Sequence, residues 1–197
     1  EKKTGLLLTI EDGGVCGAEL SNVQKVFDLG VRLITLTWNY ENAFAYPNGS
    51  QGGLKPLGIQ AVEEMNRLGI LVDVSHLSDD GFWDVRKYSK RPFLASHSNA
   101  RAVTGHQRNL TDEMIRAIGE AGGIIGLNFA PGFLGEDEQS RVSDMVRHVL
   151  HLREKGGIGL DDAHLFRDEH ALEQRRKLGK SARLHCRKSV GGNTQSI

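Results

Sequence analysis

The sequence alternates between short apolar runs and longer stretches of helical periodicity, and this alternation restricts the fold more than any other feature. Runs rich in apolar and β-branched residues predict strands at residues 5–11, 32–38, 71–77, 92–98 and 123–129. Amphipathic stretches that follow these runs predict helices at residues 19–29, 57–68, 81–88, 111–121 and 140–154. Strand and helix repeated in this order give parallel strands joined by right-handed crossovers. We therefore expect an α/β fold.

Residues that commonly begin and end helices support these boundaries. Ser78 and Thr111 stand where a side-chain oxygen caps the first turn of the helix that follows. Gly30, Gly69 and Gly122 each follow the last residues of a predicted helix, where the chain often turns into a left-handed conformation that glycine adopts without strain. The connections between strands and helices are therefore expected to be tight.

The predicted strands are apolar almost throughout, as in LLLTI and LITLT. Such strands are typical of a parallel sheet that is covered on both faces. A doubly wound sheet and a (β/α) barrel both satisfy this pattern. No Gly-x-Gly-x-x-Gly turn follows the first strand, so nothing in the sequence favours a dinucleotide-binding fold.

Charge and cysteine content narrow the range of partners and compartments. The chain carries 25 basic and 25 acidic residues, so neither nucleic acid nor an anionic membrane surface is an expected partner. No apolar run reaches the length of about 18 residues that a membrane helix needs, and we expect no secretory signal. Cys16 and Cys186 form no disulfide pattern, which favours a reducing compartment and hence the cytoplasm. The composition defines no oligomeric state.

The character of the sequence changes near residue 157. Residues 158–197 contain eight basic and five acidic residues and no run that predicts a strand. The stretch HALEQRRKLGKSARLHCRKS within them has the periodicity of a basic helix with a thin apolar face. We expect residues 1–157 to form the folded domain and residues 158–197 to be a poorly ordered basic tail.

Three side chains that can bind a metal ion stand where predicted strands end. Glu11 ends LLLTIE, His76 ends LVDVSH and His97 ends FLASH. Functional residues of parallel α/β folds collect at the carboxyl ends of the strands, and one carboxylate with two imidazoles is a ligand set that suits zinc. A single histidine at a strand end is more often structural. Two of them on adjacent strands, beside a glutamate, make a metal site an equally good interpretation.

Four other residues have side chains suited to binding or catalysis. Arg108 lies just before the helix predicted at residues 111–121, where an arginine either clamps a substrate carboxylate through two parallel hydrogen bonds or serves the loop itself. His148 and His151 fall on one amphipathic helix, and we expect both to be solvated on its surface. His106 lies in a loop, and its position predicts no particular role.

Several long, ordered motifs resemble the membrane (renal) dipeptidases, a family of zinc peptidases. The segment EMNRLGILVDVSHLSDDGFWDV is similar to that family, as are SHSNARAV and RNLTDEMIRAIGEAGG. IEDGG resembles the family's Glu-Gly-Gly segment with a change at Asp12, and LITLTWNYENAFAYPNG resembles a strand and loop of its bacterial members. The similarity extends from about Gly5 to Gly157.

The resemblance implies a TIM-type (β/α)8 barrel that carries two zinc ions and hydrolyses dipeptides with a metal-activated hydroxide. By their places in the motifs, Glu11 matches the glutamate that bridges the two metals, and His76 and His97 match the histidines that complete the second zinc site. Arg108 matches the arginine that binds the substrate carboxylate. The chain would then be a partial barrel of about five parallel strand-helix units, with at most one zinc site well supported.

The sequence also departs from the family pattern. The His-x-Asp pair that holds the first zinc would lie before Glu1, the catalytic acid/base aspartate is not found, and Trp38 replaces a histidine that contacts substrate in some members. We therefore expect a truncated chain with impaired dipeptidase activity, and the tail resembles the product of a frameshift.

Two alternatives stay open on the sequence alone. One is a non-catalytic zinc-binding pseudo-enzyme fragment, and the other is a barrel metallohydrolase that acts on cyclic amides. In each case we expect the chain to fold poorly alone, because its first and last strands would be unpaired sheet edges.

Overall fold

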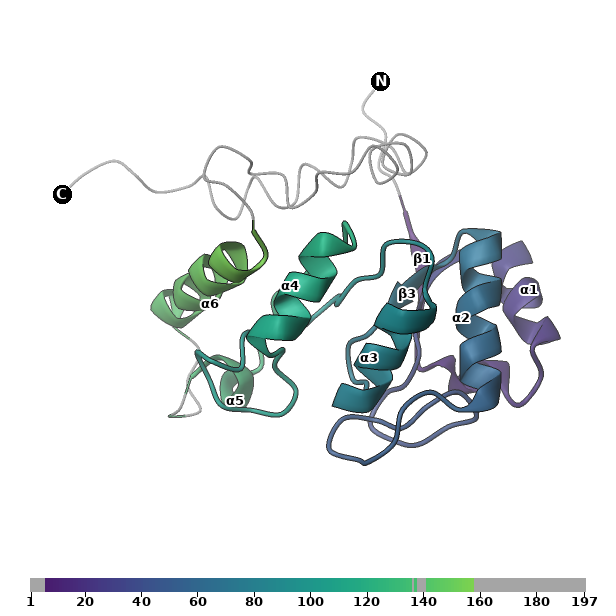
Figure 1. Cartoon of the computed structure of the whole chain (residues 1–197), viewed down its shortest axis with the longest axis horizontal. Coiled ribbons are helices and arrows are strands. Elements are labelled where there is room, and N and C mark those ends of the chain that lie inside the picture. Colours follow the sequence, from purple (N-terminus) through teal and green to yellow (C-terminus); the bar gives the residue numbers. More distant parts are fainter. Residues whose placement is uncertain (1–5, 136, 138–140, 158–197) are drawn as a thin grey trace, which may run out of the picture.

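The computed structural model describes residues 6–135, 137 and 141–157. Three parallel strands form its sheet, in the order β1 (Leu8–Glu11), β2 (Val31–Thr35) and β3 (Leu71–Asp73). The helical elements are the 3-10 turn η1 (Gly13–Cys16) and the helices α1 (Ser21–Asp28), α2 (Pro56–Leu68), α3 (Asp79–Tyr88), α4 (Asp112–Glu120), α5 (Pro131–Leu134) and α6 (Val142–Lys155). The longer helices follow one another across the molecule in chain order, from α1 to α6 (Figure 1). The predicted alternation of strand and helix is confirmed as far as α3, while within the described residues the later helices follow one another without an intervening strand.

The register of the sheet places the carboxyl ends of its strands on one level. Glu11 at the end of β1 lies opposite Thr35 at the end of β2, and Thr35 lies opposite Asp73 at the end of β3. Beyond β3, isolated parallel bridges at residues 94, 95 and 125 continue the same order. Side chains at the ends of successive strands are thereby brought to one edge of the structure.

Two of the predicted strands, at residues 92–98 and 123–129, form single bridges instead of ladders. The backbone N–H groups of Ser75 and Ser96 donate to the side chain of Asp73, at 3.0 and 2.9 Å, so they are not available to a neighbouring strand. Gly126 passes so close that a β-carbon added to it would lie 2.0 Å from the carbonyl oxygen of Ser96. Within the described residues no pairing joins β1 to the run near residue 125, so closure into a barrel stays a prediction.

The five predicted helices begin and end within two residues of their expected bounds, while the short helix α5 was not predicted. Ser78 Oγ accepts a hydrogen bond from Gly81 N at 3.0 Å at the start of α3, and Thr111 Oγ1 accepts one from Met114 N at 3.3 Å at the start of α4. Positive φ angles of 101°, 83° and 70° occur at the three predicted helix-ending glycines, Gly30, Gly69 and Gly122. The apolar faces between these caps pack into one core, which includes Val23, Ile34, Val62, Val72, Val85, Ile115 and Ile118.

None of the helices in the described ranges is long and apolar enough to cross a membrane. The basic tail predicted at residues 158–197 lies outside the described residues.

The prediction that His148 is solvated is wrong, because its side chain is fully buried. Its Nδ1 accepts a hydrogen bond from the backbone N–H of Ala100 at 3.1 Å, and its Nε2 lies 3.1 Å from the carbonyl oxygen of Leu134. The ring therefore joins α6 to the end of α5 and to the loop that contains Ala100, a role that helical periodicity does not reveal. His151 is partly buried, and its Nε2 contacts Asp112 Oδ1 at 2.7 Å.

Burial makes His148 a source of acid sensitivity. It lowers the pKa of the ring below the usual 6.5, because the charged form loses its hydration, although the bond to Leu134 opposes the shift. Below about pH 6.5 the unfolded chain takes up a proton that the folded chain refuses, so the free energy of unfolding should fall as the pH falls. Urea unfolding at pH 7.5 and pH 5.5 should show a smaller decrease for His148→Asn than for the unchanged protein.

The matched control for this experiment is His106→Asn, which alters an exposed loop histidine. This variant should keep the full pH dependence. An equal pH dependence in His148→Asn and in the unchanged protein would contradict the assignment.

The outer edge of β1 predicts self-association. Within the described residues β1 pairs only with β2, and Leu6 and Leu8 are 92% and 55% exposed. An apolar strand with free N–H and C=O groups pairs readily with another chain. We expect the purified full chain to form oligomers or to bind a hydrophobic dye, and Leu8→Lys to reduce both effects in light scattering and fluorescence.

The control is Val15→Lys, since Val15 is 69% exposed but lies in η1 and away from the strand edge. That variant should behave like the unchanged chain. A monomer with one sharp unfolding transition and no dye binding would refute the prediction that the chain folds poorly alone.

Candidate metal centre

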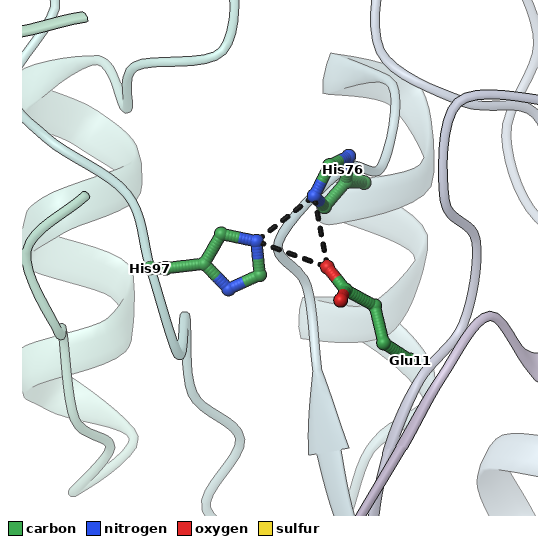
Figure 2. A group of neighbouring side chains, drawn as sticks. All are labelled: Glu11, His76 and His97. Atoms are coloured by element: carbon green, nitrogen blue, oxygen red, sulfur yellow. Dashed lines mark hydrogen bonds and ion pairs between the residues drawn. The ribbon is translucent and has the colours of Figure 1, made fainter. Parts of the chain in front are cut away.

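Three side chains converge at the carboxyl edge of the strands. Glu11 is the last residue of β1, His76 follows β3, and His97 follows the bridge at residues 94 and 95. His76 Nε2 lies 2.9 Å from His97 Nε2, and Glu11 Oε1 lies 3.2 and 3.3 Å from these two nitrogens. Figure 2 shows the two rings and the carboxylate directed at one point between them. The sequence prediction that these three residues lie together is confirmed.

The backbone next to two of these residues is constrained. Asp12 has a φ angle of 84°, and its Oδ1 accepts hydrogen bonds from Gly14 N at 2.8 Å and from Asn42 Nδ2 at 2.9 Å. These bonds hold the sharp turn that follows Glu11. His76 itself has a φ angle of 70°, a conformation that costs energy for a residue with a β-carbon and that often marks a functional site.

The hydrogen-bond partners of the two rings set which nitrogens carry protons. His76 Nδ1 lies 3.1 Å from Asn39 Oδ1, and an amide oxygen only accepts, so Nδ1 is the protonated nitrogen. His97 Nδ1 lies 2.6 Å from the hydroxyl oxygen of Ser96, whose own hydrogen is directed at Asp73. Both Nε2 atoms therefore present lone pairs to one another and to the Glu11 carboxylate.

Electrostatics keep His76 neutral. Burial, reinforced by the positive charge of Arg108 and by the nearby His97 ring, lowers the pKa of His76 to about 4, although Asp73 opposes the shift. The contact between His76 and Glu11 is therefore no salt bridge at neutral pH. Two nitrogen lone pairs and a carboxylate oxygen repel one another at these distances, and a cation placed between them removes the repulsion.

The spacing of these three atoms fits a zinc ion. A tetrahedral zinc with bonds of about 2.0–2.2 Å keeps its ligand atoms about 3.3–3.6 Å apart. The three atoms here lie 2.9–3.3 Å apart, so a slight spreading of the side chains accommodates the ion. The side chain of Glu11 is 51% exposed, which leaves the open side of the triangle accessible to water or substrate. The role of the three residues as ligands stays a prediction.

Arg108 lies beside this triangle. It lines the same small cleft as His76, and its Nη1 and Nη2 make only long contacts of 3.4 Å, with Ser98 Oγ and with the carbonyl oxygen of His97. Burial lowers the pKa of the guanidinium, while Asp73 and Glu11 oppose the shift. Within the described residues no carboxylate pairs with Arg108, so its donors are available to an anionic ligand.

The aromatic ring of Trp38 also lies at this edge, 6.4 Å from the ring of His76, and it is 43% exposed. It is therefore close enough to contact a ligand over the triangle by apolar surface, although its indole nitrogen can only donate a hydrogen bond, whereas a neutral histidine at that position could also accept one.

Sequence reasoning missed Asn39, Asp73 and Ser96, the residues that orient the two rings. A signal for Asp73 was present, because an aspartate in the middle of the apolar run LVDVS is costly to bury without a purpose. Ser96 and Asn39 are ordinary polar residues next to a strand end, and no pattern distinguishes them.

Comparison with known proteins agrees with the geometry. The family model described as "Membrane dipeptidase (Peptidase family M19)" matches residues 1–160. An uncharacterized dipeptidase of Schizosaccharomyces pombe is 33% identical over 163 residues, which are 79% of this chain and 39% of the relative.

Two solved structures are also similar. One is the dipeptidase AC, a metallopeptidase of family M19, with a TM-score of 0.73 and 36% identity over 77% of this chain and 48% of that one. The other is a metallopeptidase from Rhodobacter sphaeroides with a bound phosphinate mimic of the dipeptide L-Ala-D-Ala, with a TM-score of 0.74 and 32% identity over 96% of this chain and 57% of that one. The chain thus spans about half the length of these relatives. Since the family model covers most of the sequence and the matched structures share its fold, the chain belongs to the membrane dipeptidase family, peptidase family M19.

Proposed function

We propose that this chain carries one zinc site and the substrate-carboxylate anchor of a zinc-dependent dipeptidase. The observation that supports it most is the convergence of two unprotonated imidazole nitrogens and a carboxylate oxygen beside an arginine that has no carboxylate partner within the described residues. A metal ion at the triangle would polarise the peptide carbonyl of a dipeptide, and Arg108 beside it would bind the dipeptide's free carboxylate.

Zinc is the metal that the donor set favours. Two neutral imidazoles and one carboxylate form a three-ligand set of the kind that catalytic zinc sites use, and it leaves a fourth position for water or substrate. When bound, zinc supplies polarisation of the peptide carbonyl and lowers the pKa of water. Glu11, His76 and His97 hold the ion, and the low pKa of His76 keeps that ligand unprotonated under mildly acidic conditions.

Arg108 binds the free carboxylate of the dipeptide in this proposal. A guanidinium offers two parallel N–H donors to a carboxylate, and its partial burial strengthens that pairing because water competes less. The Rhodobacter sphaeroides relative binds a mimic of L-Ala-D-Ala, which makes this dipeptide the first substrate to test. Trp38 would cover an apolar side of the bound dipeptide.

A second candidate is a zinc-binding pseudo-enzyme. It is favoured by the ligand set, since the described residues offer three ligands for a single ion. Zinc binding without turnover would distinguish it from a dipeptidase of reduced activity.

Zinc titration tests the three proposed ligands directly. A calorimetric titration of the metal-free full chain with zinc should give about one weak site, because the chain supplies three protein ligands for one ion. His76→Ala should abolish binding, whereas His151→Ala, which changes a histidine bonded to Asp112, should not. Two tight sites per chain would show that further ligands have been overlooked.

The role of Arg108 can be tested through the affinity for the substrate. With zinc present, the full chain should hydrolyse L-Ala-D-Ala slowly, and Arg108→Lys should raise KM about 10-fold or more with little change in kcat, because lysine cannot form the two parallel bonds. Arg86→Lys is the control, since Arg86 is exposed and pairs with Glu120 at 3.7 Å. An unchanged KM in Arg108→Lys would remove Arg108 from the substrate site, and a chain that binds zinc but releases no alanine would favour the pseudo-enzyme.

A further inference from the structure

Asp73 is a buried carboxylate without a cationic partner among the described residues. Its side chain is fully buried, and each of its oxygens accepts two hydrogen bonds. Oδ1 accepts from the backbone N–H groups of Ser75 and Ser96, at 3.0 and 2.9 Å, and Oδ2 accepts from the hydroxyls of Thr35 and Ser96, at 2.6 and 2.5 Å. An ionised carboxylate loses its hydration when it is buried, and four hydrogen-bond donors offset that cost.

Two of the four donors come from Ser96, which is the residue before His97. The Ser96 hydroxyl has one hydrogen, and it is directed at Asp73, because a carboxylate can only accept. At its 2.6 Å contact with His97 Nδ1 the Ser96 oxygen must therefore be the acceptor, and the ring nitrogen the donor. The chain Asp73–Ser96–His97 thus fixes the proton of the imidazole on Nδ1.

A third contact fixes the backbone of His97. The backbone N–H of His97 donates to Ser75 Oγ at 3.1 Å, so both the main chain and the side chain of His97 are tied to the end of β3. With the proton on Nδ1 and the backbone fixed, Nε2 presents its lone pair toward Glu11 and His76. His76 has a weaker arrangement, since its Nδ1 meets one exposed amide oxygen of Asn39.

We infer that Asp73 and Ser96 are the positioning residues of the zinc site, acting on the metal through the tautomer and orientation of His97. The inference deepens the proposed function, on which its metal readout rests. Partners that accept a hydrogen bond from the far nitrogen of a metal-binding histidine commonly change metal affinity about 10–100-fold when they are removed. Here the carboxylate acts at one remove, through a serine hydroxyl.

The competing explanation is that Asp73 only joins the sheet to the chain near residue 96. Both roles predict a loss of stability when Asp73 is replaced, and Asp73→Asn is liable not to fold. Ser96→Ala separates them, because it keeps the backbone N–H bond to Asp73 and removes the hydroxyl, which donates to Asp73 and accepts from His97. A purely structural role predicts that this variant loses stability while the tautomer of His97 stays unchanged. Ser96 is exposed, so the loss of its oxygen leaves no buried cavity.

The test measures two properties of the full chain. In the metal-free protein, nitrogen chemical shifts of the His97 ring should report the Nδ1–H form in the unchanged chain and a mixture of tautomers in Ser96→Ala. In zinc titrations the dissociation constant of Ser96→Ala should rise about 10–100-fold. Ser96→Thr keeps a hydroxyl and should restore both properties.

Ser89→Ala serves as the control, since Ser89 also uses its hydroxyl in two hydrogen bonds, with Asn66 and Arg91, but lies away from the triangle. It should leave the tautomer and the zinc affinity unchanged. An unaltered tautomer and affinity in Ser96→Ala would overturn the inference. If the unchanged chain binds zinc but does not hydrolyse dipeptides, the proposed dipeptidase activity fails while this inference stands. If the unchanged chain binds no zinc, the role of Asp73 and Ser96 at a zinc site is refuted, and the tautomer measurement shows only whether Ser96 fixes the proton of the His97 ring.

Discussion

The carboxylate of Asp73 is the group on which the carboxyl edge of the sheet depends. It lies at the end of β3 and accepts hydrogen bonds from β2, from Ser75 just beyond β3 and from the segment that leads to His97. Backbone N–H groups that would otherwise continue a ladder are directed to this side chain, so the sheet ends there and the chain is free to turn. The bonds that end the regular sheet also hold the segments that carry His76 and His97, whose Nε2 atoms lie 2.9 Å apart.

Much of this arrangement can be read from the sequence. Hydrophobic periodicity predicts the helices and the order of the parallel runs, because burial of an apolar face decides where an amphipathic segment lies. Strand-end placement predicts that Glu11, His76 and His97 meet, because parallel strands bring their carboxyl ends to one edge. Caps at Ser78 and Thr111 are local features and are predicted correctly for that reason.

The rest depends on contacts between residues far apart in the chain. His148 is bonded to Ala100 in a loop and to Leu134 at the end of α5, and nothing within α6 itself indicates these contacts. The shortening of the fourth strand follows from the side chain of Asp73, which accepts the backbone N–H bond of Ser96, and no strand propensity records such a contact. The tautomers of the two metal-facing rings likewise follow from Asn39 and Ser96, whose roles exist only in the folded chain.

The position of Glu11 has a consequence for the entropy of the chain. Glu11 ends the strand whose outer edge has no partner within the described residues, whereas His76 and His97, 21 residues apart, are tied to the core through Asn39, Ser75 and Ser96. An ion shared by all three would act as a cross-link that closes a long loop between the first strand and the remainder of the domain. Such a link limits the conformations of the opened chain more strongly the longer the loop it closes. The ion would thus stabilise the edge strand β1 in addition to its chemical role. Fraying of β1 would then be coupled to loss of the metal.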